Sequence, residues 1–178
     1  MAHMRYEIRI AADGRDMADV RALFEEYHAW LGEVVCSRRL AEEIASLPGP
    51  YAAPAGRLLL AVDTGGRAVG VVGVRPHEAG GAEIKRLYVR PEARTAGLGR
   101  RLMDEAVAAA RSLGYGRALI TTLPDSMGSA LRMYERMGFT PTTPFVDHSH
   151  VSEDVRMVYL ELRLDEPDGL VGHIAQPI

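Results

Sequence analysis

Apolar residues follow two different periods along this chain, and each period identifies a kind of element. They recur at helical spacing from Leu98 to Leu113, which predicts an amphipathic helix that opens at Gly97 or Leu98. Helical faces also occur over residues 17–31 and 38–47, and a further helix ends in the segment 130–139. Short apolar runs bounded by glycine or proline predict strands at residues 5–11, 57–62, 68–74, 83–89, 117–123 and 155–164.

The order of these elements predicts a mixed α/β fold. Residues 63–66, Asp-Thr-Gly-Gly, lie between two strands and indicate a hairpin. The strand at 83–89, the long helix and the strand at 117–123 form a crossover unit. We therefore expect a central mixed, largely antiparallel twisted sheet of about six to seven strands, flanked by helices. One domain is expected over residues 1–164, followed by a loose C-terminal tail over residues 165–178.

Composition excludes several classes of protein. A chain of 178 residues buries about 70% of its unfolded surface and folds without disulfides or metals. The formal charge of −3 argues against a nucleic-acid partner, and no apolar run approaches the roughly 20 residues of a membrane span. The single cysteine, Cys36, suits a reducing compartment and predicts a cytoplasmic protein. One lysine among many arginines indicates a GC-rich bacterial genome.

The turn before the long helix is a candidate site for a phosphate. It reads Arg94-Thr95-Ala96-Gly97-Leu98-Gly99 and joins a strand to a helix. A helix N-terminus presents unpaired N–H groups and the positive end of its dipole, and glycines let an anion approach the backbone. The dinucleotide fingerprint does not fit, because no glycine follows at the required spacing. The Walker loop does not fit either, because the only lysine is Lys85.

This turn resembles the Arg/Gln-x-x-Gly-x-Gly/Ala motif of the GNAT superfamily of N-acetyltransferases. The run Leu-Tyr-Val-Arg-Pro before the turn, Pro144-Phe145 after it and the strand at 58–62 resemble a bacterial branch of mostly uncharacterised members. The segment from Ala130 through Tyr134 to Gly138-Phe139 resembles the second signature of that superfamily. Together the two signatures cover roughly residues 82 to 140. The resemblance implies a GNAT-like fold with acetyl-CoA as co-substrate.

The resemblance also implies which residues bind the coenzyme. Backbone groups of one strand would pair with the pantetheine arm as an added strand does, and the backbone amides of the turn would bind the pyrophosphate. A serine of the second helix would replace an asparagine of many relatives, where this chain has Met127. The implied residues are Leu87, Tyr88, Val89, Arg94, Thr95, Ala96, Gly97, Leu98, Gly99, Arg100 and either Ser126 or, as we expect, Ser129.

Glu83 and Tyr134 are the implied catalytic residues. Glu83 lies eleven residues before Arg94, which is the interval of the general-base glutamate in the histone-acetylating branch. A partly buried carboxylate would have a raised pKa suited to a base. Tyr134 would protonate the leaving thiolate with an unperturbed pKa of about 10. Structural alternatives stand beside both roles: Glu83 as an ion-pair partner of Lys85 or Arg86, and Tyr134 as a core residue.

The sequence thus predicts an N-acetyltransferase that acts on a primary amine, either of a small molecule or an exposed amino group. Direct attack in a ternary complex is expected, because Cys36 has no nucleophile context. The alternative is a non-catalytic acyl-CoA-binding module. The run Asp147-His148-Ser149-His150 lacks further ligands for a metal, so we expect none. Loops around Trp30, Tyr51 and Pro144 should line the acceptor pocket, and a homodimer is compatible with related domains.

Overall fold

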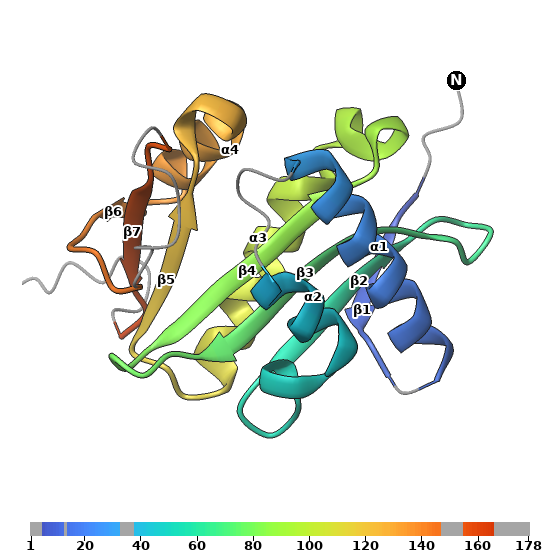
Figure 1. Ribbon diagram of the computed structural model, residues 1–178, viewed down its shortest axis with the longest axis horizontal. Coiled ribbons are helices and arrows are strands. Elements are labelled where there is room, and N and C mark those ends of the chain that lie inside the picture. The colour runs from blue at the N-terminus through green and yellow to red at the C-terminus, as the bar shows by residue number, and fades with distance from the viewer. Residues whose placement is uncertain (1–4, 13, 33–37, 147–154, 166–178) are drawn as a thin grey trace, which may run out of the picture.

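A single twisted sheet forms the framework of the protein (Figure 1). The computed structural model describes residues 5–12, 14–32, 38–146 and 155–165. Within them the sheet has seven strands in the order β1-β2-β3-β4-β5-β7-β6, and only the β4–β5 pair is parallel. The expected mixed, largely antiparallel sheet is confirmed. The strands are β1 (Glu7–Ile10), β2 (Arg57–Val62), β3 (Ala68–Pro76), β4 (Ala82–Val89), β5 (Arg117–Thr122), β6 (Thr140–Pro141) and β7 (Val158–Arg163).

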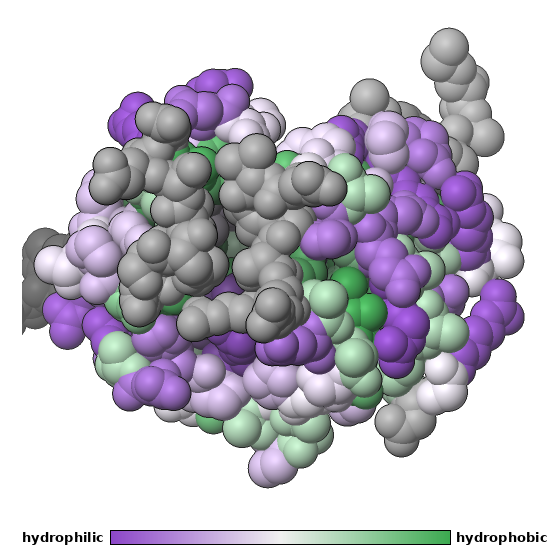
Figure 2. All heavy atoms as spheres, in the orientation of Figure 1, coloured by the Kyte–Doolittle hydropathy of each residue, from purple (hydrophilic) through white to green (hydrophobic). Residues whose placement is uncertain are grey.

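Helices cover both faces of this sheet and create two apolar cores. α1 (Arg15–Leu31) and α2 (Arg38–Ala45) lie on the near face in Figure 1, and α3 (Leu98–Ser112) lies on the far face. α4 (Pro124–Arg136) packs beside β5, and two short 3-10 helices are η1 (Gly49–Tyr51) and η2 (Pro91–Ala96). The outer side of α1 carries hydrophilic side chains (Figure 2), as expected for an amphipathic surface helix.

Most predicted elements appear at the expected places. The hairpin at residues 63–66 is confirmed, and the Asp63 carboxylate holds it by accepting hydrogen bonds from the amides of Gly65 and Arg67, both at 2.9 Å. The last strand begins at Val158, three residues later than expected. The two-residue strand β6 was not predicted, because two residues show no period. The tail beyond residue 165, Cys36 and the run 147–150 lie outside the described residues.

β4 carries the irregularity that creates the site. Its register with β3 passes from Val71↔Tyr88 to Gly73↔Lys85, so two residues of β4 oppose one residue of β3 in a β-bulge. Arg86 lies in this bulge in the left-handed region, with φ 60. On its other side, β4 pairs with β5 only at Ala82↔Ala118 and Glu83↔Leu119, and the strands then diverge (Figure 1). Among the described strands, none pairs with this edge of β4 beyond Glu83.

Gly73 provides a test of how tightly β3 is packed beneath η1. A Cβ atom at this position would lie 2.7 Å from Cδ1 of Tyr51, whose side chain is buried. Gly73→Ala is therefore expected to destabilise the fold by about 1–3 kcal/mol, because the Tyr51 ring must move. Thermal unfolding measures this effect. Gly99→Ala is the control, since its Cβ would meet only Val89 Cγ2, at 3.9 Å. Equal melting temperatures for the two variants would contradict the packing argument.

Candidate active site

A cavity lies where β4 and β5 diverge, and its volume of about 570 Å³ is within the range of small-molecule sites. Residues of β4, β5, α1, α2 and α4 line it. Glu83 and Tyr134, the two residues expected to be catalytic, both border this cavity. Trp30, Tyr51 and Pro144, around which the acceptor pocket was expected, do not line the cavity, although Leu31, Pro50 and Val146 near them do. Leu31 belongs to α1 and Pro50 to η1.

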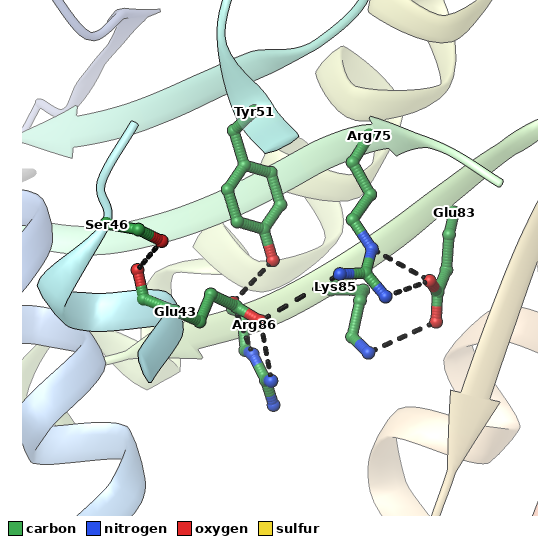
Figure 3. A network of polar contacts seen from close by, with 7 residues as sticks. All are labelled: Glu43, Ser46, Tyr51, Arg75, Glu83, Lys85 and Arg86. Carbon is green, nitrogen blue, oxygen red and sulfur yellow. Dashed lines mark hydrogen bonds and ion pairs between the residues drawn. The ribbon is translucent and has the colours of Figure 1, made fainter. Parts of the chain in front are cut away.

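Glu83 is fully buried and held by two cations. Nε and Nη2 of Arg75 donate hydrogen bonds to Glu83 Oε2 at 2.9 and 2.7 Å, and Lys85 Nζ lies 3.3 Å from Oε1 (Figure 3). The geometry of the Lys85 contact is that of an ion pair, because Oε1 accepts no hydrogen bond from the described residues. The alternative that Glu83 pairs with Lys85 is confirmed. Its pairing with Arg86 is not observed, because Arg86 binds Glu43 instead.

The expected rise of the Glu83 pKa is wrong. Burial by itself raises the pKa of this carboxyl, but the charges of Lys85 and Arg75 and the hydrogen bonds from Arg75 outweigh burial and lower it below 4.5. Lys85 lies two residues along the same strand, and Arg75 on β3 stands directly opposite Glu83 on β4. Glu83 is therefore ionised at neutral pH.

Glu43 is a second buried carboxylate beside this pair, and no sequence motif marked it. Its oxygens accept hydrogen bonds from Nε and Nη2 of Arg86 at 2.9 and 3.0 Å and from the Tyr51 hydroxyl at 2.7 Å. Arg75 Nη1 lies 4.0 Å away. Burial raises the pKa of Glu43, but the hydrogen bonds and charge of Arg86 lower it overall. The two carboxylates thus belong to one network that connects α2, η1, β3 and β4 (Figure 3).

Tyr134 lies both in the apolar core and at the cavity. Its side chain is 6% exposed, its ring centroid lies 6.0 Å from that of Phe139, and it belongs to the core that α3 shares. It also borders the cavity. The expected unperturbed pKa is wrong, because burial raises the pKa of the Tyr134 hydroxyl well above its usual 10. The hydroxyl is therefore protonated at neutral pH. Met127 borders the same cavity and interrupts α4 with φ −131.

The glycine turn has the geometry of an open helix N-terminus. α3 begins at Leu98, as predicted, and Gly97 precedes it in the left-handed conformation with φ 65. No side chain caps this helix, and its first turn carries no acidic residue. A Cβ atom at Gly97 would meet nothing within 4 Å. The first-turn N–H groups of an uncapped helix lack intrahelical partners, and an anion is a natural partner for them.

The side chains of two arginines near the turn, Arg94 and Arg100, contact other groups of the protein. Arg94 Nε donates to the Val89 carbonyl at 2.8 Å, and its guanidinium lies 5.5 Å from the Trp30 ring centroid. Arg100 pairs with Asp104 at 2.9 Å. A coenzyme that pairs with the Val89 carbonyl would have to displace Arg94. Leu87 borders the cavity, whereas Ser129 is exposed on α4 and does not line it.

Neither a metal site nor a membrane span is found in the described ranges. No group of histidine, cysteine, aspartate and glutamate there could hold a metal ion. No helix there is long and apolar enough to cross a bilayer. The run at residues 147–150 lies outside these ranges and is not tested by this finding.

Comparison with known proteins points to a family of acetyltransferases. The family model described as acetyltransferase (GNAT) matches residues 18–139. An uncharacterized N-acetyltransferase from Schizosaccharomyces pombe is 34% identical over 153 residues, which are 85% of this chain and 91% of that protein. Because this relative is a yeast protein, the expected bacterial origin stays a prediction.

Solved structures share the fold. A GNAT-family acetyltransferase from Staphylococcus aureus superimposes with a TM-score of 0.70 at 16% identity, over 89% of this chain and 99% of that chain. The yncA protein from Salmonella typhimurium, solved with its cofactor acetyl-CoA, gives a TM-score of 0.63 at 23% identity, over 93% and 98% of the two chains. The family match, the yeast relative and the shared fold together show that this chain belongs to the GNAT family and is an acetyltransferase with acetyl-CoA as its co-substrate.

Proposed function

We propose that this enzyme transfers the acetyl group of acetyl-CoA to a primary amine by direct attack in a ternary complex. The observation that carries the proposal is the presence of Glu83 and Tyr134 on one cavity, beside the unpaired edge of β4. A carboxylate can accept the proton of the amine, and a phenol can donate a proton to the leaving thiolate. Family membership favours the enzyme over a non-catalytic acyl-CoA-binding module.

The coenzyme would lie along the C-terminal half of β4. Its pyrophosphate would bind backbone N–H groups of the turn, where Gly97 is left-handed and α3 is uncapped. Its pantetheine arm would pair with the open edge at Leu87 and Tyr88, as an added strand does. The thioester would then reach the cavity near the bulge of β4. Thr95, Ala96, Leu98, Gly99 and Arg100 are the other proposed backbone ligands of the turn, and Ser129 is the proposed ligand on α4.

Glu83 is the proposed base, acting directly or through one water. Its lowered pKa makes it a weak base, but the same two cations that lower it also disfavour an ammonium ion beside it. An acceptor amine would therefore lose its proton more readily on entering the cavity. The amine nitrogen attacks the thioester carbonyl, its proton passes to Glu83, and the C–S bond breaks.

Tyr134 is the proposed acid for the departing thiolate, and Tyr134→Phe tests the reaction. The variant keeps the ring and its packing, so coenzyme affinity should stay unchanged. We expect kcat to fall about 10- to 100-fold, which is a smaller loss than is usual when a general base is removed. The reason is that the thiolate of an alkyl thiol with a pKa near 8.5 leaves readily even without a proton. Thiol release from acetyl thioesters measures the rate. The loss should be largest for thioesters of the least acidic thiols. Equal rates for variant and parent with every thioester would make Tyr134 a core residue alone.

Several broader expectations belong to this proposal. A cytoplasmic location fits the single cysteine. One domain over residues 1–164 is the proposed organisation, and a homodimer without a nucleic-acid partner is the proposed state. Size-exclusion chromatography with light scattering measures the oligomeric state directly.

A further inference from the structure

Five side chains form a charged cluster at the end of the cavity away from the glycine turn: Glu43, Arg75, Glu83, Lys85 and Arg86 (Figure 3). The two carboxylates lie at the back, with exposed side-chain fractions of 1% for Glu83 and 9% for Glu43. The three cations are more accessible, at 25% for Arg75, 21% for Lys85 and 15% for Arg86. The surface that the cluster presents to the cavity is therefore cationic.

The charges in this cluster do not balance. Arg86 uses its guanidinium on Glu43, in two hydrogen bonds of 2.9 and 3.0 Å. Arg75 and Lys85 share the remaining carboxylate, Glu83, and Lys85 is the more weakly bound of the two, at 3.3 Å. Tyr51 adds no charge, because burial raises the pKa of its hydroxyl. Glu42 also borders the cavity, but its side chain is exposed and water screens it. Lys85 thus lacks a carboxylate of its own among the described residues.

The position of the cluster indicates that it would bind the acceptor and not the phosphates of the coenzyme. β4 runs from the cluster toward the glycine turn, and the four residue steps from Lys85 to Val89 span about 13 Å. Lys85 therefore cannot reach a pyrophosphate bound at the N-terminus of α3. Arg75, Glu83 and Lys85 border the same cavity as Tyr134, where the acetyl group would be transferred.

We propose that the acceptor is a small amino acid-like molecule, whose carboxylate binds Lys85 and Arg75 while its amine faces Glu83. This inference rests on the proposed transfer to an amine. A carboxylate would give Lys85 the missing partner and form charge-assisted hydrogen bonds. Polyamines and lysine-rich peptides are disfavoured, because their further positive charges would meet a cationic wall. The cavity of about 570 Å³ must also hold the thioester end of the coenzyme, which favours a small acceptor.

Burial lowers the pKa of Lys85 to about 8, with Glu83 opposing this shift. A bound carboxylate would stabilise the ammonium form and raise that pKa. The reactivity of Lys85 toward acylating reagents should therefore fall when the acceptor binds, because only the neutral amine reacts.

The kinetic test compares each of the coded amino acids, β-alanine and 4-aminobutyrate with its carboxamide, by thiol release from acetyl-CoA. We expect the accepted acids to exceed their amides at least about 10-fold in kcat/KM, mainly through KM. Lys85→Met should remove this preference, whereas Lys85→Arg, which keeps the charge, should retain most of it. Amides or simple amines that react as well as the acids would overturn the inference and leave the proposed function intact.

A binding test separates this inference from the reaction. Lys85 is the only lysine of the chain, so an N-hydroxysuccinimide ester labels one side-chain amine, which peptide mapping distinguishes from the N-terminus. Free amino acids and their carboxamides also consume the ester, so labelling of Lys85 is scored as its ratio to labelling of the N-terminus in the same sample. We expect the accepted amino acids to lower this ratio without any coenzyme present, and their carboxamides not to do so. An equal ratio with and without every amino acid would overturn the inference. Protection without thiol release would support the carboxylate site and refute the proposed reaction.

Discussion

Glu83→Gln is expected to lower kcat by about 10²- to 10⁴-fold, the usual contribution of a general base. The amide has nearly the shape of the carboxylate but accepts no proton at neutral pH. Coenzyme affinity should stay unchanged, because the proposed coenzyme ligands lie further along β4 and in the glycine turn. Steady-state kinetics and calorimetry with acetyl-CoA measure the two quantities separately.

The pH dependence adds a second check on Glu83. Because the ion pairs lower its pKa, the acid limb of kcat/KM that reports Glu83 should lie below pH 4.5. The same shift links to stability. The ionised form is favoured in the folded state, so its contribution is present above the unfolded pKa and is lost as the pH falls through the folded pKa. The variant should consequently be less stable at neutral pH, and its melting temperature must be measured beside its rate.

Glu26→Gln is the matched control for the loss of a paired carboxylate. Glu26 binds the guanidinium of Arg90 at 2.6 to 3.2 Å but does not line the cavity. This variant should retain the parent kcat. An unchanged kcat in folded Glu83→Gln would return Glu83 to a purely structural role and leave the base to another group.

Gly97→Glu is expected to weaken acetyl-CoA binding about 100-fold or more. Loss of two hydrogen bonds to a charged pyrophosphate at about 1.5 kcal/mol each accounts for that factor, and the added negative charge repels the ligand further. The fold should persist, because a Cβ at this position meets nothing within 4 Å. A left-handed glutamate, at φ 65, still carries some strain. Calorimetry measures the affinity, and circular dichroism checks the fold.

Gly97→Asn separates charge and bulk from backbone conformation. Asparagine tolerates the left-handed region better than other residues and adds no charge, so this variant should keep most of the affinity. Parent-like binding by Gly97→Glu would show that the pyrophosphate does not bind at the N-terminus of α3.

The sequence was most informative where local chemistry decides the structure. Helical period and two glycines placed the start of α3 at Leu98, and Asp63 with its glycines marked the hairpin. These two features depend on neighbours within a few residues of one another. That Glu83 and Tyr134 border one cavity depends instead on the tertiary fold, and the sequence indicated these residues only through the resemblance to a family.

Features that depend on distant partners were not predictable in the same way. The charge of Lys85, two residues along β4, lowers the pKa of Glu83, and the charge and hydrogen bonds of Arg75 lower it further. No local pattern reveals the strand register that places Arg75 opposite Glu83. Glu43 lies on α2 and meets Arg86 only through tertiary packing. The burial of Tyr134 depends likewise on how α4 packs on the sheet. Its sequence neighbours predicted that the ring packs in the core, but they did not predict that burial raises the pKa of the hydroxyl.

β4 and β5 pair at only two positions, so acetyl-CoA bound along the rest of this β4 edge, as proposed, would make the thermal stability of the protein depend on its metabolic surroundings. Among the described strands, none pairs with β4 on that side beyond Glu83. A ligand that pairs with this edge binds the native chain and not the unfolded one, so mass action adds about 2.7 kcal/mol when its concentration is 100 times its Kd. A cell rich in acetyl-CoA would thus hold a longer-lived enzyme, and a starved cell would expose the same chain to its proteases more often.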